Sequence, residues 1–226
     1  MDQLSVFAKH WQPGAVKTRL AAAIGHDHAS AVYRSFVLCL LKRLAGLADR
    51  RVVVYWPPDR IADVQPLAGT AWCVEHQCGE DLGARLHHHL AAALSQGARR
   101  VVLVGSDSPT VPREYVARAF DLLGTHPVVL GPAEDGGYYL VGAAGAVPPI
   151  FSGIAWSTAH VWEQTVARLR QTGHSFGVLP TWYDVDEVRE LIRLRDELER
   201  RPHLEPELEG VLDTIRQALC HNGSRP

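Results

Sequence analysis

RRVVLVGSD, residues 99–107, decides the fold, because it is the clearest buried strand in the chain. Its core VVLVG is a continuous apolar run, which is typical of a parallel strand covered on both faces. Polar residues follow at once, and Pro112 suits the first turn of a helix after the strand. The stretch therefore predicts one strand–helix unit of an α/β sheet.

Short apolar runs alternate with longer amphipathic stretches over most of the chain, which is the mark of βαβ units. We therefore predict a three-layer α/β fold, with helices on both faces of a mainly parallel, mixed central sheet. GPAEDGGYYLVGAA, residues 131–144, departs from this rhythm and predicts an antiparallel strand or hairpin. The expected strands are 4–8, 51–56, 70–77, 99–107, 127–131, 138–143 and 175–180, and the main expected helices are 27–47, 81–97, 158–173 and 186–201.

Composition limits the kind of protein. The 226 residues are 46% apolar and carry a formal charge of −2, which does not favour a nucleic-acid or anionic-membrane partner. No apolar run is long enough to span a bilayer, and MDQLSVFAK lacks the layout of a signal peptide, so we expect a cytoplasmic protein. We expect one domain over 1–200, followed over 201–226 by a helix and a frayed polar tail.

Every predicted strand is followed by glycine, charge or both, and ligands bind at the carboxyl ends of strands in open α/β sheets. The first such loop lies in FAKHWQPGAVKTRL, residues 7–20, and contains Lys9, Gly14, Lys17 and Arg19. A flexible glycine, the free N–H groups of the next helix and three cations fit phosphate binding. The alternative is that Lys17 and Arg19 decorate an exposed helix. The loop matches neither a P-loop nor GxGxxG.

Two acidic groups suit a hard divalent cation. Asp107 directly follows the apolar strand, where a carboxylate can bind Mg²⁺ or Mn²⁺ or, alternatively, cap the turn before Pro109. In YDVDE, Asp184 and Asp186 alternate with Val185 and share a face of an extended chain. Asp186 is the better candidate for the N-cap of the last helix, and Asp184 the better metal ligand.

EDGGY, residues 134–138, offers Glu134 and Asp135 beside two glycines. A base for an acceptor hydroxyl would fit there, as would an acceptor-binding turn or a plain Asp-Gly hairpin. Trp156, in GIAWST, could line the site or cap the core. The consecutive His87, His88 and His89 point in three directions on a helix, so they cannot share one metal, and we expect at least two to be exposed.

Six motifs, taken in chain order, resemble those of a bacterial glycosyltransferase-like family that is often labelled a radical-SAM/selenodomain-associated transferase. The resemblance runs from about residue 4 to 190 and implies the GT-A fold of nucleotide-diphospho-sugar transferases. The layout is also similar to that of 2-phospholactate guanylyltransferases. The six motifs are FAKHWQPGAVKTRLAAAIG, GEDLGARL, VVLVGSDSPTVP, VVLGPAEDGGYYLVG, FSGIAWST and LPTWYDVDE.

The resemblance also implies roles for individual residues. Lys17 and Arg19 would hold nucleotide phosphates with Lys9 nearby, and Asp107 would be the metal-binding aspartate of the GT-A "DxD" region. Because this chain has Ser106 and Ser108 on either side, Asp184 or Asp186 is the expected second ligand. The remaining expected residues are Gly14, Ser106, Asp81 and Arg85 on the nucleotide side, and Gly136, Gly137, Tyr138 and Trp156 on the acceptor side.

In one respect the first motif departs from the family pattern. His10 and Trp11 stand where a proline is common, which predicts a differently shaped loop.

The function expected from these motifs is a transferase that depends on Mg²⁺ or Mn²⁺ and uses a nucleotide-activated donor. In the first version the donor is a nucleotide sugar and the acceptor a small molecule of unknown identity. In the second, a nucleoside triphosphate donates a nucleotidyl group to a phosphorylated acid. A non-catalytic nucleotide-binding protein of the same fold is a third hypothesis.

Overall fold

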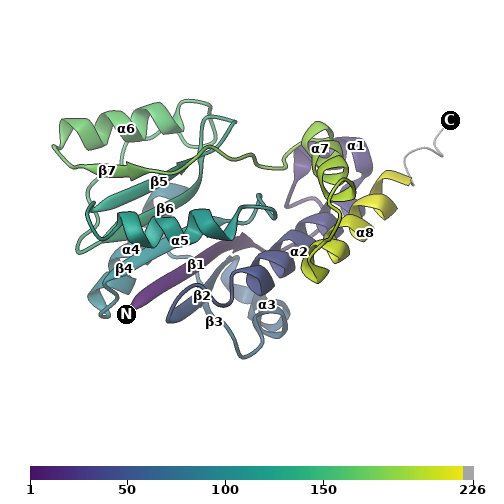
Figure 1. The fold of residues 1–226 in the computed structure, drawn as a ribbon, viewed down its shortest axis with the longest axis horizontal. Helices are drawn as coiled ribbons and strands as arrows, with labels where there is room; N and C mark the ends of the chain where they lie inside the picture. The colour runs from purple at the N-terminus through teal and green to yellow at the C-terminus, as the bar shows by residue number, and fades with distance from the viewer. Residues whose placement is uncertain (221–226) are drawn as a thin grey trace.

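The computed structural model describes residues 1–220, and its centre is a seven-stranded sheet in the order β3-β2-β1-β4-β6-β5-β7 (Figure 1). β6 runs antiparallel to both β4 and β5, and all other neighbours are parallel. The predicted mixed, mainly parallel sheet is therefore confirmed, including the antiparallel strand in 131–144. The strands are β1 (Asp2–Lys9), β2 (Arg50–Trp56), β3 (Cys73–His76), β4 (Arg100–Gly105), β5 (Val128–Pro132), β6 (Tyr138–Ala144) and β7 (Phe176–Val178).

Helices cover both faces of the sheet, which confirms the three layers. α2, α3 and α5 pack in the core on one face, and α4 and α6 pack in the core on the other. Of these helices, α3 was not expected from the sequence. The helices are α1 (Thr18–Ile24), α2 (His26–Arg43), α3 (Ile61–Ala68), α4 (Leu82–Ser95), α5 (Arg113–Leu122), α6 (Val161–Gln171), α7 (Val188–Glu199) and α8 (Pro206–Cys220), with a short 3-10 turn η1 (Pro58–Arg60). No helix within residues 1–220 is long and apolar enough to cross a membrane.

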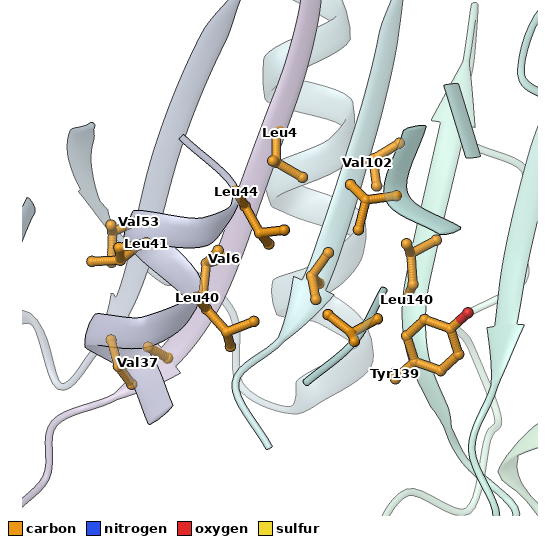
Figure 2. Close-up of a cluster of buried hydrophobic side chains, with 14 of the residues drawn as sticks. Leu4, Val6, Val37, Leu40, Leu41, Leu44, Val53, Val102, Tyr139 and Leu140 are labelled. Atoms are coloured by element: carbon orange, nitrogen blue, oxygen red, sulfur yellow. The ribbon is translucent and has the colours of Figure 1, made fainter. Parts of the chain in front are cut away.

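The apolar run of β4 explains why residues 99–107 decide the fold. Val102 and Val104 belong to the core beneath α2 and α5, whereas Val101 and Leu103 belong to the core beneath α4. Because successive side chains of a strand point to opposite faces, a strand buried on both faces must be apolar throughout. Figure 2 shows the first of these cores, where side chains of β1, β2 and β4 meet α2.

A third core joins four helices beyond the carboxyl end of β1 (Figure 1). α8 lies in the expected C-terminal segment 201–226 and packs against α2 in this same core. The buried Arg43 of α2 ties this group of helices to the loop after β4, since it donates to Glu205 at 2.7 Å and to the Pro109 carbonyl at 2.7 Å. Residues 221–226 of the predicted tail lie outside the described part of the chain.

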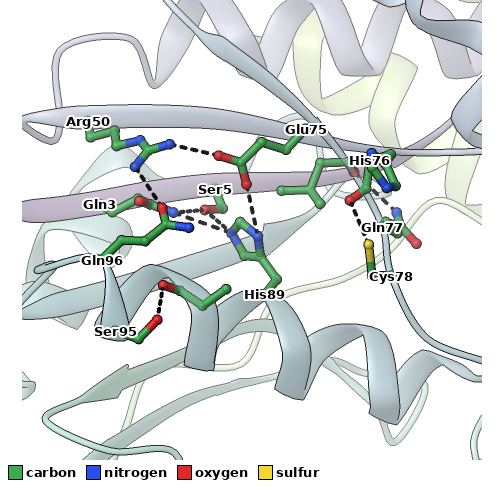
Figure 3. A network of polar contacts seen from close by, with 12 residues as sticks. Gln3, Ser5, Arg50, Glu75, His76, Gln77, Cys78, His89, Ser95 and Gln96 are labelled. Carbon is green, nitrogen blue, oxygen red and sulfur yellow. Dashed lines mark hydrogen bonds and ion pairs between the residues drawn. The ribbon is translucent and has the colours of Figure 1, made fainter.

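A buried histidine joins α4 to the sheet (Figure 3). His87 and His88 are exposed, as expected, while His89 is buried and its Nε2 lies 2.7 Å from the Ser5 hydroxyl of β1. The Arg50–Glu75 ion pair, 2.7 Å long, lies beside it, with Glu75 Oε2 3.7 Å from His89 Nδ1. Burial and the positive charge of Arg50 lower the pKa of His89 to about 4, so the ring is neutral at pH 7.

The segment before α6 packs on the turn between β5 and β6. Gly136 has a φ of 88°, and its carbonyl accepts a hydrogen bond of 2.8 Å from the Trp162 N–H. A Cβ at this position would overlap the backbone of Ala159. Glycine is therefore required both for the left-handed conformation and for the close approach of the two segments.

We predict that protonation of His89 destabilises the fold. The unfolded state, with a pKa near 6.5, binds the proton more tightly than the folded state, so stability is retained above pH 6.5 and falls as the pH drops towards 4. Between pH 7 and 5 the loss due to this residue is about 2 kcal/mol. Urea unfolding at pH 7 and at pH 5 measures the free energy of unfolding. Between these pH values it should fall by about 2 kcal/mol less in His89→Gln than in the wild type. The exposed His87→Gln is the control, and an unchanged pH dependence in His89→Gln would contradict the prediction.

We also predict that Gly136→Ala destabilises the protein far more than Gly145→Ala. Both glycines have positive φ, at 88° and 74°, but a Cβ at Gly145 meets nothing within 4 Å. The two variants share the backbone strain, and the difference between them, roughly 1–3 kcal/mol, reports the overlap with Ala159. Chemical denaturation measures this difference, and equal losses would show that the two segments are not in tight contact.

Candidate functional site

A cavity of about 490 Å³ opens at the carboxyl edge of the sheet. Its walls are the ends of β1 and β4, the turn 15–19, the start of β6, and residues of α4. Of the residues predicted to bind a nucleotide, five line this cavity: Lys9, Lys17, Arg19, Arg85 and Ser106. The topology thus brings together side chains that are far apart in the sequence.

The loop after β1 is shaped by a tight turn. The Ala15 N–H donates to the Gln12 carbonyl at 3.0 Å, with Pro13 and Gly14 between them and a φ of 82° at Gly14. Proline followed by a glycine of positive φ is the pattern of a type II turn. Gly14 therefore shapes the loop, while the cavity wall itself begins at Ala15.

Lys17 is the most enclosed charged side chain of the site. Its Nζ contacts Asp107 Oδ1 after β4 and lies 2.7 Å from Asp186 Oδ1 before α7. Only 4% of the Lys17 side chain is exposed. Although burial alone would lower the pKa of Lys17, the two carboxylates raise it above its usual value, so the ammonium stays charged.

Tyr33 of α2 forms a second link between the same loops. Its hydroxyl accepts a hydrogen bond from the Lys9 N–H at 2.8 Å and lies 2.7 Å from the Ser106 hydroxyl. Its ring lies 5.9 Å from Lys17 Nζ. Burial, together with the charge of Asp107, raises the pKa of Tyr33 to about 12, so the hydroxyl remains protonated. The sequence analysis did not identify Tyr33, because no pattern in its own helix indicates that its hydroxyl contacts loops far away in the sequence.

Asp184 lies beside Asp107, as expected. The Val185 N–H donates to the Asp107 carbonyl at 2.9 Å, and the Ser108 hydroxyl donates to the Asp184 carboxylate. Burial and the nearby charge of Asp107 raise the pKa of Asp184 to about 7. The two carboxylates therefore repel each other when both are ionised, and this repulsion favours the protonated form of Asp184.

The expectation that Asp186 caps the last helix is wrong. Glu187 is the N-cap of α7 and forms a capping box with Glu190, because the chain enters the helix one residue later than expected. Asp186 is left free of the helix, and its carboxylate pairs with Lys17 instead.

The donor atoms of Asp107 and Asp184 fit a hard divalent cation. Both supply only oxygen, and their mutual repulsion would be relieved by a positive ion between them. Residues 1–220 contain no cluster of three or more His, Cys, Asp or Glu that could hold a metal by themselves. Two carboxylates completed by substrate phosphates are nevertheless a usual setting for Mg²⁺.

Arg85 and Asp81, both predicted to lie near the base or sugar of the nucleotide, have different positions in the structure. Arg85 lines the cavity, and its guanidinium stacks over Trp56 at 4.0 Å. Asp81 is outside the cavity wall, where it caps α4 by accepting from the Ala84 N–H at 2.7 Å. Gln77, which sequence reasoning missed, is buried in the wall and donates to the carbonyls of Ala8 and Val54, each at 3.1 Å.

Glu134 and Asp135 have different surroundings. Arg193 of α7 holds Glu134 through two hydrogen bonds of 2.6 and 3.1 Å and thereby lowers its pKa. Asp135 accepts from the Gly137 N–H at 2.8 Å, and its charge helps to raise the pKa of Asp184. Of the two, Asp135 is therefore the one whose charge acts on Asp184.

Tyr138 and Trp156 meet edge to face, with ring centroids 6.2 Å apart. Tyr138 lines the cavity, but Trp156 does not. Trp156 stacks on Phe151 at 6.4 Å and packs closely on Gly83 of α4. Trp156 therefore packs against the core beside Tyr138, and its predicted role on the acceptor side stays a prediction.

His10 and Trp11 fasten the first loop to neighbouring helices. His10 Nε2 lies 3.1 Å from Asp63 of α3, and the rings of His10 and Trp11 are 4.9 Å apart. The guanidinium of Arg34 in α2 lies 5.6 Å from the Trp11 ring. These contacts give the two unusual residues a structural role at the start of the loop.

Comparison with solved structures supports the fold. A candidate nucleotide-diphospho-sugar transferase of Desulfovibrio desulfuricans G20 is 34% identical, with a TM-score of 0.86, over 96% of this chain and 97% of its own. A cytidylyltransferase of Leptospira borgpetersenii (12% identity, TM-score 0.55) covers 100% of this chain and 98% of its own. CMP:2-keto-3-deoxy-manno-octonic acid synthetase, solved with CTP, is 14% identical with a TM-score of 0.54, over 88% and 98%. The last two likenesses show the fold of nucleotide-using transferases and nothing finer.

Sequence comparison gives the family. A search of curated proteins found no significant match. The profile of a family described as "Uncharacterized protein conserved in bacteria (DUF2064)" matches residues 40–158, which include β4, the Asp107 loop and the EDGGY turn. Together with the relative that is 34% identical over nearly its whole length, this match shows that the chain belongs to the DUF2064 family, whose fold is that of the nucleotide-diphospho-sugar transferases.

Proposed function

We propose that this protein is a transferase that takes a group from a nucleotide sugar and depends on Mg²⁺ or Mn²⁺. The observation that carries the proposal is the cavity at the carboxyl edge, which is lined by the cations Lys9, Lys17 and Arg19 and by the carboxylates of Asp107 and Asp186. Cations beside carboxylates are what a diphosphate and its metal require together. The resemblance of the sequence motifs to those of the radical-SAM/selenodomain-associated transferases agrees with this proposal, and membership of that group stays a prediction.

The cations would bind the donor diphosphate. Lys9 and Arg19 are exposed at the cavity and carry side chains long enough to follow the phosphates, while Lys17 is held at its floor by two carboxylates. Fixed positive charge stabilises the diphosphate as it leaves, because charge builds on its oxygens in the transition state. The nucleoside would lie towards Gln77 and Arg85, the polar side chains on the β3 and α4 side of the cavity.

Asp107 and Asp184 are the residues that would hold the metal. A bound Mg²⁺ or Mn²⁺ supplies Lewis-acid neutralisation of the leaving diphosphate. Asp184 must be ionised to contribute, and with a pKa of about 7 it is only partly ionised at neutral pH. Asp186 completes the group of carboxylates through its contact with Lys17.

Asp135 is the proposed proton acceptor for the attacking hydroxyl. It lies in the turn before β6, and Tyr138 two residues past Gly136 lines the cavity. Glu134 is less suited, because its ion pair with Arg193 favours a carboxylate of low basicity. Gly136 gives the turn its shape by allowing the close contact with Ala159, and the predicted acceptor contacts of Gly136 and Gly137 stay a prediction.

Negative charge around the EDGGY turn favours a neutral acceptor. Asp135 and Asp184 are close enough for the charge of one to raise the pKa of the other, and Arg193 is already paired with Glu134. A phosphorylated acid would be repelled there by like charge. Transfer of a sugar to a hydroxyl compound is therefore preferred over nucleotidyl transfer to a phosphorylated acid.

We predict that the wild type, given nucleotide sugars, Mn²⁺ and a panel of small hydroxyl compounds, releases nucleoside diphosphate in an acceptor-dependent way. Asp107→Asn should lower the rate on the order of 100-fold, because the variant loses a metal ligand worth several kcal/mol of charge stabilisation. Coupled detection of nucleoside diphosphate measures the rate. Glu163→Gln, which removes an exposed carboxylate on α6, is the matched control and should be fully active.

The product distinguishes the alternatives. Release of pyrophosphate from a nucleoside triphosphate in the presence of a phosphorylated acid would replace the proposal with nucleotidyl transfer. Full activity of Asp107→Asn would contradict the proposed metal site. Nucleotide binding by calorimetry without turnover on any donor would favour a non-catalytic nucleotide-binding protein.

A further inference from the structure

We propose that Lys17 is an internal counter-ion that makes metal binding depend on the nucleotide. In the free protein its ammonium holds Asp107 and Asp186; when donor phosphates arrive, Lys17 turns to them and the carboxylates become available to the divalent cation. The inference rests on the proposed nucleotide and metal site. It adds an order of events, in which the metal alone binds poorly and the metal with phosphate binds well.

The first support is the enclosure of the ammonium. The Lys17 side chain is 4% exposed, whereas the carboxylates of Asp107 and Asp186 are 43% and 40% exposed. The carboxylates thus remain open to the cavity on one side while the lysine occupies them from the other. A divalent cation that used Asp107 would have to share this carboxylate with an ammonium, and like charges that share one ligand repel each other.

The second support is the distribution of negative charge. Asp184 lies beside Asp107. Within residues 1–220 its carboxylate accepts a hydrogen bond from the Ser108 hydroxyl and forms no ion pair with Lys17, whose ammonium contacts Asp107 and Asp186. The Lys17 ammonium therefore neutralises Asp107 and Asp186 directly, and its charge also acts on the neighbouring Asp184. Removing the positive charge of Lys17 from this group would leave a strongly negative site with oxygen donors, which is the chemistry that Mn²⁺ and Mg²⁺ prefer.

The third support is the backbone of Lys17, which has a φ of 47° and a ψ of 45° at the start of α1. Among residues 1–220 only Lys17 and Ser157 are non-glycine residues with positive φ, and both line this cavity. A left-handed conformation is costly for lysine and persists only where contacts hold it. The Lys17 carbonyl accepts from the Ala21 N–H at 2.8 Å, and its ammonium contacts Asp107 and Asp186, so both ends of this residue are held at the cavity.

A purely structural lysine would behave differently. If the only role of Lys17 were to hold the loops together, its substitution would weaken the binding of every ligand, including the metal. If it is a counter-ion, its removal must strengthen the binding of metal alone. The sign of the change in metal affinity separates the two roles.

The experiment is a titration of the full-length protein with Mn²⁺ alone, with free Mn²⁺ followed by electron paramagnetic resonance. Lys17→Gln should bind Mn²⁺ at least ten-fold more tightly than the wild type, while Lys17→Arg, which retains the charge, should stay within about three-fold of it. Arg189→Gln removes one exposed positive charge from α7, outside the cavity lining, and should bind Mn²⁺ like the wild type. Equal or weaker binding by Lys17→Gln would overturn the proposal.

Stability gives a readout that does not depend on turnover. In EDTA, Lys17→Gln should melt below the wild type because Asp107 and Asp186 lose their partner, and Mn²⁺ should raise its melting temperature more than that of the wild type. A loss that Mn²⁺ does not restore would show that the lysine is only structural.

The wild type provides a test that needs no folded variant of Lys17. The ¹⁵N signal of its buried ammonium should be unchanged by Mg²⁺ alone and should shift when Mg²⁺ and pyrophosphate are added together. A shift with Mg²⁺ alone would contradict the proposed order. If Mg²⁺ and pyrophosphate bind, as judged by calorimetry, and the signal does not move, the counter-ion role is wrong while the proposed function stands. If they do not bind at all, both fail.

Discussion

The contact of the Lys17 ammonium with Asp107 and Asp186 is the interaction on which the site depends. It joins three segments that the chain separates widely: the loop after β1, the loop after β4 and the approach to α7. A charge buried to this degree is stable only when it is paired, because desolvation is otherwise too costly. The three segments are therefore held in one arrangement by the need to keep that ammonium and its carboxylates together.

The sheet and the helical group beyond it make this contact possible. β1 and β4 are parallel neighbours, so their carboxyl ends lie side by side, and the Tyr33 hydroxyl contacts both loops. On the other side, the backbone of Val185 donates to the Asp107 carbonyl. Arg43, bound to Glu205 and to the Pro109 carbonyl, fixes the same loop to the segment before α8. The helices after residue 186 thus serve the site as well as their own core.

Local sequence patterns predicted the parts of the molecule that depend on local physics. The apolar run of residues 99–107, the Pro-Gly turn and the antiparallel β6 all follow from periodicity and turn chemistry. The sequence also placed Asp107 and Asp184 at the same edge, because strand ends of a parallel sheet meet there. α3 was missed because Pro66 lies inside a helix of only eight residues. The partners of Lys17, the hydroxyl of Tyr33 and the amide of Gln77 could not be predicted, since each acts on residues far along the chain and no local spacing encodes such contacts.

The central claim is that the carboxyl edge of the sheet is the site of a nucleotide diphosphate and its metal. The most direct measurement is a crystal structure of the protein grown with Mn²⁺ and a nucleoside diphosphate, with anomalous data collected for manganese. The account predicts a manganese peak at Asp107 and Asp184, with the diphosphate contacting the 15–19 turn and Lys17 turned towards it. A nucleotide bound elsewhere, or manganese at other residues while Lys17 keeps both carboxylates, would contradict the account.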